Sequence, residues 1–273
     1  MLFRIITIAA VCSVGCSSPI SSQPYNLVNA AGNTVQSRFN IPAGYKRVQA
    51  DDFTLYLRTM PLQPHGATLY LYNKQPKGRQ DVHAAILKMD AGTKDLQQCA
   101  DAVMRLRAEY LYHSGMQDDI HFNFTNGFRA DYSKWKQGNR IQVRGNNVAW
   151  VKNAESNNSY ASFRRYMDVV FTYAGTLSLS KELKNIRFSA LKPGDVLIQG
   201  GSPGHAVIVV DVAINNMGNK IFMLAQSYMP AQEIHIVHNP RNKSISPWYS
   251  TEEIDTIIET PEWDFTINDL KRF

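Results

Sequence analysis

A histidine and a glutamine stand where two neighbouring strands can bring them together. His205 follows a GGSPG loop and opens the apolar run HAVIVVDV, and Gln226 closes a second apolar run, IFMLA. If these runs are antiparallel strands joined by the turn-rich segment 215–219, the end of the second lies next to the start of the first. A histidine whose ring is oriented by a polar partner supplies two members of a nucleophilic triad. The third member must come from elsewhere in the chain.

Cys99 is one candidate for the nucleophile. It lies in DLQQCADAVMRLRAEYLY, where a capping-box spacing predicts a helix over 95–112 with Cys99 about one turn inside. A thiol near a helix N-terminus has a lowered pKa, which favours a nucleophile. Cys99 also shares the helical spacing of Val103 and Leu106, as a small apolar core residue would. Both interpretations remain open.

The histidine strand resembles the papain-like cell-wall amidases of the NlpC type. The matching residues are Pro193-Gly194-Asp195, Gly204-His205 and Gln226. The resemblance implies an α+β fold, with a papain-like antiparallel sheet, packed helices and a β-rich N-terminal extension. In these amidases the catalytic cysteine opens a helix. The corresponding helix here, predicted over 160–174, carries Ser162 instead.

Two functional hypotheses follow, and their nucleophile positions exclude each other. In the first, the protein keeps the amidase groove as a noncatalytic binder of cell-wall peptide or glycan, with Ser162 in front of His205. In the second, it is an active cysteine amidase or peptidase that cleaves amide bonds in cell-wall peptides. Cys99 would then attack the carbonyl, His205 would act as base and acid, and Gln226 would orient the imidazole.

The N-terminus predicts an envelope lipoprotein. Residues 1–16 contain Arg4, a short apolar run and Gly15-Cys16, and they resemble a bacterial lipoprotein signal peptide cleaved before a lipidated Cys16. The apolar run is too short to span a membrane. A secretory peptide and an uncleaved anchor are the alternatives. Lipidation would attach the protein to a membrane, in the periplasm or at the outer membrane, and leave Cys99 as the free thiol.

Taken end to end, the chain resembles an uncharacterised family of lipoproteins from anaerobic Gram-negative gut bacteria. The blocks that carry this resemblance are QQCADAVMRLRAEYL, SPGHAVIVVD and LAQSYMPAQEIHI. It implies a cell-envelope location and brings no activity with it.

The composition of the chain limits the classes of partner that it is expected to bind. The 273 residues carry a formal net charge of +6, which suits an anionic cell-wall polymer. Basic residues are scattered and no nucleic-acid motif occurs, so nucleic acid is not expected as a partner. No cofactor is expected, because the chain has no Gly-rich phosphate loop. No metal is expected either, since Asp118-Asp119-x-His121 and Glu233-x-His235-x-x-His238 lack zinc spacing and are predicted to be solvated.

The predicted organisation places a flexible tether over 17–37 before a globular domain over 38–273. Within it, 38–150 is the β-rich N-terminal part with the Cys99 helix, and 151–273 is the papain-like core. Alternation and turn signals predict further elements in the N-terminal part. These are strands over 53–58, 68–72, 82–87 and 120–124, a helix over 129–137, and a hairpin of 141–144 with 148–151.

Overall fold

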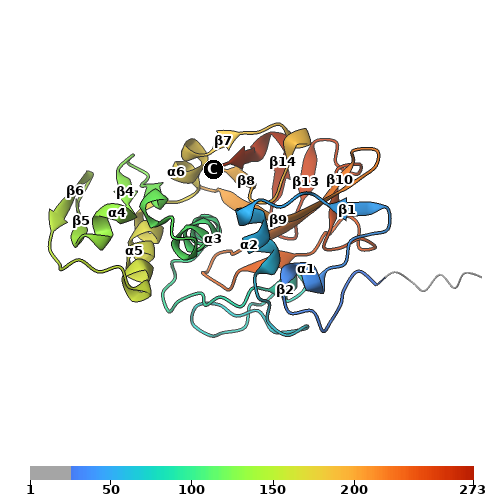
Figure 1. The fold of residues 1–273 in the computed structure, drawn as a ribbon, viewed down its shortest axis with the longest axis horizontal. Helices are drawn as coiled ribbons and strands as arrows, with labels where there is room; N and C mark the ends of the chain where they lie inside the picture. The colour runs from blue at the N-terminus through green and yellow to red at the C-terminus, as the bar shows by residue number, and fades with distance from the viewer. Residues whose placement is uncertain (1–25) are drawn as a thin grey trace, which may run out of the picture.

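A large antiparallel sheet forms the centre of the computed structural model, which describes residues 26–273 (Figure 1). In this part of the chain the sheet has nine strands, in the order β2-β11-β10-β9-β8-β15-β7, with β1 paired to β9 and β12 to β10. The protein is therefore α+β, as predicted. The strands are β1 Tyr45–Arg47, β2 His83–Ile86, β7 Lys184–Asn185, β8 Val196–Gln199, β9 His205–Asn215, β10 Lys220–Gln226, β11 His235–Val237, β12 Tyr249–Ser250 and β15 Leu270–Arg272.

Strand β9 is the central strand of this sheet. Its sequence is apolar on both faces, and such strands are stable only when both faces are covered. The structure meets that requirement with two cores. Ala206, Ile208 and Val210 enter the larger core, and Val207 and Val209 enter the smaller one. The predicted central strand that begins on His205 is confirmed.

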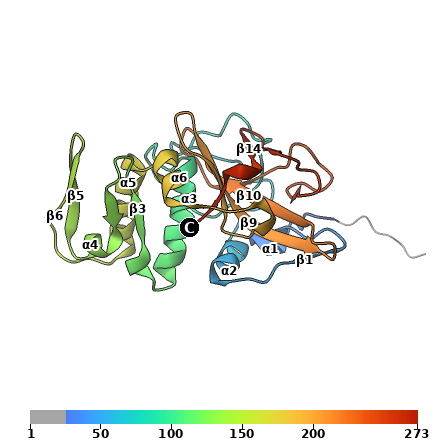
Figure 2. The same cartoon turned by 90° about the horizontal axis from the view of Figure 1, so that it is seen from above.

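Helix α3 (Cys99–His113) covers the side of the sheet that faces the larger core. It contacts β9 and β10, and most of its residues are buried. A helix that is covered nearly all round belongs to the interior of a fold. Figures 1 and 2 both place α3 between the sheet and helices α4 and α5.

Between α3 and β8 the chain builds a lobe beside the sheet, drawn in green and yellow in Figure 2. Its helix α5 (Tyr160–Tyr173) begins behind Ser159 as predicted, with the Ser159 hydroxyl accepting from the Ser162 N–H. The expectation that this helix packs on the sheet is wrong, because α3 occupies that position and α5 packs on α4. The other lobe elements are β3 His121–Asn123, β4 Arg129–Asp131, α4 Tyr132–Lys136, β5 Asn139–Arg144, β6 Asn147–Lys152 and α6 Thr176–Glu182.

Two buried aspartates join the sheet to neighbouring segments through ion pairs with arginines. Asp211 of β9 pairs with Arg47 of β1 at 2.6 Å and with Arg58 of α2 (Asp52–Thr59) at 2.5 Å. Asp195, from the PGD turn before β8, accepts two hydrogen bonds from Arg272 of β15, at 2.6 and 2.9 Å. Since each carboxylate is fully buried, its charge is compensated by guanidinium groups rather than by water.

Several predicted elements differ in the structure. The segment 53–58 is helix α2 rather than a strand, because the Asp51 side chain caps its N-terminus and Phe53 and Leu57 bury one helical face. The segment 68–72 forms only isolated bridges. The strand over 82–87 and the hairpin of β5 and β6 are confirmed. The small sheet of β13 (Ile257–Glu259) and β14 (Asp264–Thr266) was not predicted.

The folded part begins earlier than predicted. Helix α1 (Val35–Arg38) has a fully buried Val35, and Val28 forms a bridge with Phe39, so the end of the expected tether packs on the domain. Strands β1 and β2 join the same sheet as the strands after 151, so the expected N-terminal part and papain-like core share one sheet. Cys16 lies outside the described residues. Within 26–273, no helix has the length and apolar character needed to cross a bilayer.

Candidate functional site

Cys99 is the first residue of α3, directly after the N-cap Gln98. The predicted position one turn inside the helix is therefore wrong, because the N-terminal box is formed one turn later than expected. The Gln98 N–H donates to Asp101 Oδ2 at 3.0 Å. Cys99 consequently lies at the positive end of the helix dipole, where backbone N–H groups have no partners within the helix.

A buried arginine anchors the segment that leads into Cys99. Arg105, further along α3, donates to the Gln97 side chain and to the Asp90 backbone. It also pairs with Asp90 at 2.9 Å and with Glu109 at 3.3 Å. Because these contacts join the chain before Cys99 to the helix after it, the thiol is held by a rigid junction.

His205 opens β9 inside an aromatic enclosure. Its ring lies 5.0 Å from that of Tyr228, 5.5 Å from that of Trp263 and 5.8 Å from that of Phe265, measured between centroids. Only 2% of the residue is exposed. Burial lowers the pKa of His205 to about 4, against a smaller opposing effect of its hydrogen bond to Gln226. The imidazole is therefore neutral at neutral pH.

Gln226 orients this imidazole as predicted. His205 Nε2 lies 2.8 Å from Gln226 Oε1, and the glutamine is fully buried at the end of β10. Nδ1 of His205 forms no hydrogen bond within residues 26–273, so it is the ring nitrogen left for chemistry.

The thiol lies beside the start of the histidine strand. The backbone N–H groups of Ala100 and of Ala206, the residue after His205, face the sulfur and favour the thiolate. Burial is the larger effect and raises the pKa of Cys99 to about 11, so the lowered pKa expected for a thiol at a helix N-terminus is wrong. The resting site thus combines a neutral thiol with a neutral imidazole, and in the described part of the chain no hydrogen bond joins the two side chains.

Ser162 lies apart from these residues. Its hydroxyl accepts a hydrogen bond from Trp135 Nε1 at 3.1 Å, and the residue is fully buried between α4 and α5. The prediction that Ser162 faces His205 is wrong, because α3 rather than α5 packs on the sheet beside His205. The structure brings Cys99, His205 and Gln226 to one region and leaves Ser162 in the core of the lobe.

A pocket of about 400 Å³ opens beside Cys99. One wall is the loop 200–204, in which a Cβ atom on Gly204 would lie 2.6 Å from Thr176 Oγ1 and 2.7 Å from the Gln199 carbonyl oxygen. The absence of a side chain there lets the loop pack closely on α6. The full lining is Gln98–Asp101, Thr125, Phe171, Ala174–Leu177, Gly201–Gly204 and Met229.

The residues that surround Gln226 were not predicted from the sequence. Gln226 Nε2 donates to Glu262 Oε2 at 2.8 Å and lies 3.3 Å from His235 Nε2. His235 was predicted to be solvated, yet it is fully buried, because β2 pairs with β11 and covers it. In the structure, His235 pairs directly with Gln226 in the β10–β11 register. No signal in the sequence indicated Glu262, which lies in the loop between β13 and β14.

No group of three or more histidine, cysteine or acidic side chains in residues 26–273 has the arrangement of a metal site. The thiol, the imidazole and the amide are the groups that this site offers for chemistry.

Comparison with known proteins identifies a family without a described activity. No curated protein and no solved structure matches the chain. A family model described as "Domain of unknown function (4846)" matches residues 35–272, which include the sheet, the lobe and the candidate site. The chain therefore belongs to the family of domain of unknown function 4846.

Proposed function

We propose that this protein is a papain-like cysteine hydrolase that cleaves amide bonds in cell-wall peptides. The observation that carries the proposal is the His205–Gln226 hydrogen bond of 2.8 Å at the end of β9 against which the Cys99 helix packs. A thiol at a helix N-terminus, a histidine at a strand start and an amide on the next strand form the triad pattern of papain-like enzymes. The substrate class rests on the resemblance of the PGD turn and Gly-His strand to cell-wall amidases.

In the first half-reaction, the sulfur of Cys99 attacks the amide carbonyl carbon while His205 Nδ1 takes the thiol proton. The carbonyl oxygen gains negative charge, which the N–H groups at the start of α3 stabilise. The carbon–nitrogen bond then breaks, and the proton on His205 passes to the leaving amine. The product of this step is a thioester on Cys99.

In the second half-reaction, water attacks the thioester carbon and gives a proton to His205. The carbon–sulfur bond breaks, the proton returns to the sulfur, and a carboxylic acid leaves. Because the thiol has a raised pKa and the imidazole a lowered one, the proton rests on sulfur, and its transfer to His205 has to be coupled to attack on the carbonyl.

We further propose that the enzyme is attached to the cell envelope through lipid on Cys16. This part rests on the sequence of residues 1–16. A net charge of +6 favours a position close to anionic polymers of the envelope.

An activated ester tests the catalytic part without knowledge of the natural substrate. The detergent-solubilised full chain, incubated with p-nitrophenyl acetate, should release p-nitrophenolate in repeated turnovers and carry a transient acetyl group on Cys99 by mass spectrometry. Cys99→Ala and His205→Ala should abolish turnover. Ser162→Ala, which removes the rejected nucleophile candidate, should retain it.

Purified cell-wall muropeptides then test the substrate class. The wild-type chain should release new peptide termini that Cys99→Ala does not release. A wild-type protein that binds muropeptides but leaves Cys99 unacylated by the ester would contradict the hydrolase and support a noncatalytic binder.

A further inference from the structure

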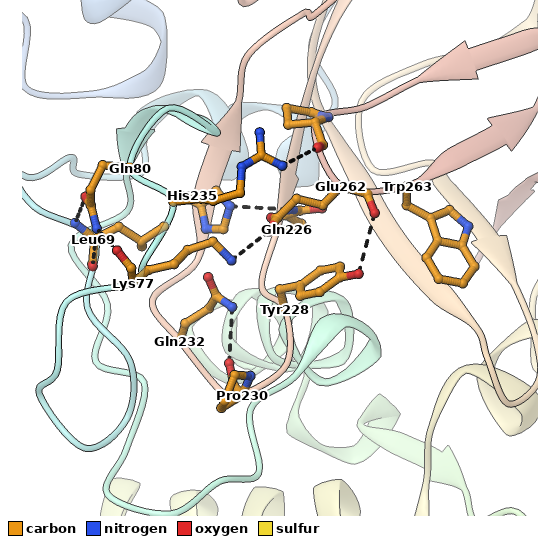
Figure 3. A network of polar contacts seen from close by, with 12 residues as sticks. Leu69, Lys77, Gln80, Gln226, Tyr228, Pro230, Gln232, His235, Glu262 and Trp263 are labelled. Atoms are coloured by element: carbon orange, nitrogen blue, oxygen red, sulfur yellow. Dashed lines mark hydrogen bonds and ion pairs between the residues drawn. The ribbon is translucent and has the colours of Figure 1, made fainter.

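The amide of Gln226 is held on three sides by polar groups. Oε1 lies 2.8 Å from His205 Nε2, and Nε2 lies 2.8 Å from Glu262 Oε2 and 3.3 Å from His235 Nε2. Figure 3 shows Gln226, His235 and Glu262 of this network, with Lys77 reaching Glu262 from the loop before β2. The Lys77–Glu262 ion pair measures 2.7 Å, and both side chains are about nine-tenths buried.

The identities of these neighbours leave one orientation for the amide. As a carboxylate paired with Lys77, Glu262 accepts hydrogen bonds and cannot donate. The amide atom that faces it must therefore be the NH₂ group. The carboxylate of Glu262 therefore determines which way the amide of Gln226 points.

His235 favours the same orientation through a second, longer contact. Its Nδ1 lies 3.0 Å from the backbone carbonyl of Glu233, which only accepts, so Nδ1 carries the hydrogen. Burial lowers the pKa of His235 to about 3, so the ring is neutral and its Nε2 has a lone pair. That lone pair accepts the second N–H of Gln226.

With both N–H groups of Gln226 engaged, only its carbonyl oxygen is left for His205. A carbonyl oxygen accepts, so His205 Nε2 must carry the ring hydrogen of the neutral imidazole. Nδ1 is then the lone-pair nitrogen, and it is the nitrogen without a hydrogen bond in residues 26–273. The protonation pattern of His205 thus follows from residues that do not touch it.

We propose that Glu262, supported by Lys77, and His235 are positioning residues that hold Gln226 in one amide orientation and thereby keep His205 as a base at Nδ1. The catalytic importance of this arrangement rests on the proposed cysteine hydrolase. The arrangement itself can be measured without any activity.

The experiment is nitrogen NMR of the full chain with ¹⁵N-labelled histidine, with the His205 signals assigned from their loss in His205→Gln. Wild-type protein at pH 7 should show a protonated Nε2 and an unprotonated Nδ1 on His205. Glu262→Gln has nearly the same shape but can donate toward Gln226, so it permits the flipped amide. This variant should show a mixture of tautomers and a Cys99 acylation rate reduced by about tenfold or more, since the wrong tautomer cannot take the thiol proton.

The controls separate positioning from general stability. Glu259→Gln removes an exposed carboxylate from neighbouring β13 and should change neither the tautomer nor the acylation rate. Glu262→Asp keeps an obligate acceptor and should restore the wild-type tautomer. If Glu262→Gln does not fold, His235→Gln removes the longer of the two acceptor contacts and should shift the tautomer in the same direction by a smaller amount.

Two results would overturn the inference. One is a wild-type His205 that carries its hydrogen on Nδ1. The other is a folded Glu262→Gln protein with an unchanged tautomer. If wild-type protein shows the expected tautomer but Cys99 is never acylated, the proposed hydrolase fails while the positioning of His205 by Glu262 and His235 stands.

Discussion

His205 and His235 are joined through a single side chain, because Gln226 accepts from one ring and donates to the other. Both rings are buried and both have depressed pKa values, about 4 for His205 and about 3 for His235, with burial as the main cause. Neither ring can take up a proton without disturbing the site.

This pairing predicts acid destabilisation. Because both folded-state pKa values lie below the unfolded value of about 6.5, the neutral rings contribute stability that is complete above pH 6.5 and falls as the pH drops toward 4. The free energy of unfolding from urea titrations should therefore decrease between pH 7 and pH 4. His235→Gln should flatten this decrease relative to wild type. An equally steep decrease in the variant would show that other groups cause it.

The raised pKa of Cys99 predicts a loss of stability at high pH. Its folded-state pKa of about 11 exceeds the ordinary value of 9.0, so its contribution to stability is present below pH 9 and is lost as the pH rises toward 11. In the folded protein, the rate of iodoacetamide labelling of Cys99 should still be rising above pH 9, as measured by mass spectrometry. A rate that already levels off below pH 8 would show a more acidic thiol than the buried site implies.

Gly204 is predicted to be intolerant of a side chain. A Cβ atom would lie 2.7 Å from the backbone oxygens of Gln199 and Gly201, so Gly204→Ala must displace the loop that leads into His205. We expect a loss of about 1–3 kcal/mol in the free energy of unfolding and slower acylation of Cys99. Gly78→Ala is the matched control, because a Cβ atom on Gly78 would have no neighbour within 4 Å, and it should change neither property. Equal behaviour of the two variants would contradict the close packing of the loop.

Asp195 is predicted to hold the last strand to the sheet. Asp195→Asn keeps the shape but weakens the two hydrogen bonds from Arg272, and charge-assisted bonds of this kind contribute about 1.5–3 kcal/mol each. Thermal unfolding should occur at a clearly lower temperature than in wild type. Asp81→Asn alters an exposed pair with Arg79 and should have little effect. A small effect at Asp195 would mean that water replaces the guanidinium at no cost.

Lipidation of Cys16 is the prediction for the N-terminus. Native protein purified from membranes should have its first residue at Cys16 and carry a diacyl or triacyl group by mass spectrometry. Cys16→Ser should release the protein from the membrane fraction. An unmodified N-terminus at another residue would remove the lipid anchor from the proposal.

The part of the site that could be predicted is the part built by local pairing. His205 and Gln226 lie on consecutive antiparallel strands, so their approach follows from one short turn and the alternation of two apolar runs. The α+β class was predicted from the resemblance of this region to cell-wall amidases. The segment 53–58 was assigned wrongly because the spacing of Phe53 and Leu57 suits a helix while the residues between them also alternate as in a strand.

The remaining contacts of the candidate site form between segments that are far apart in the sequence. Cys99 lies 106 residues before His205, and no pattern in either segment indicates that α3 rather than α5 covers the sheet. Glu262 is a single acidic residue in a loop, and its role appears only when Lys77 and Gln226 are brought to it. His235 looked solvated because its covering strand, β2, comes from the first third of the chain.

The lobe between α3 and β8 has a consequence for how this family can diversify. Thr125 and Phe171 bring the lobe to the pocket beside Cys99, whereas Cys99, His205 and Gln226 all lie outside it. Substitutions or length changes in the lobe can therefore reshape the wall of the pocket without moving Cys99, His205 or Gln226. In the proposed hydrolase, selectivity and reactivity would then be carried by separate stretches of the chain.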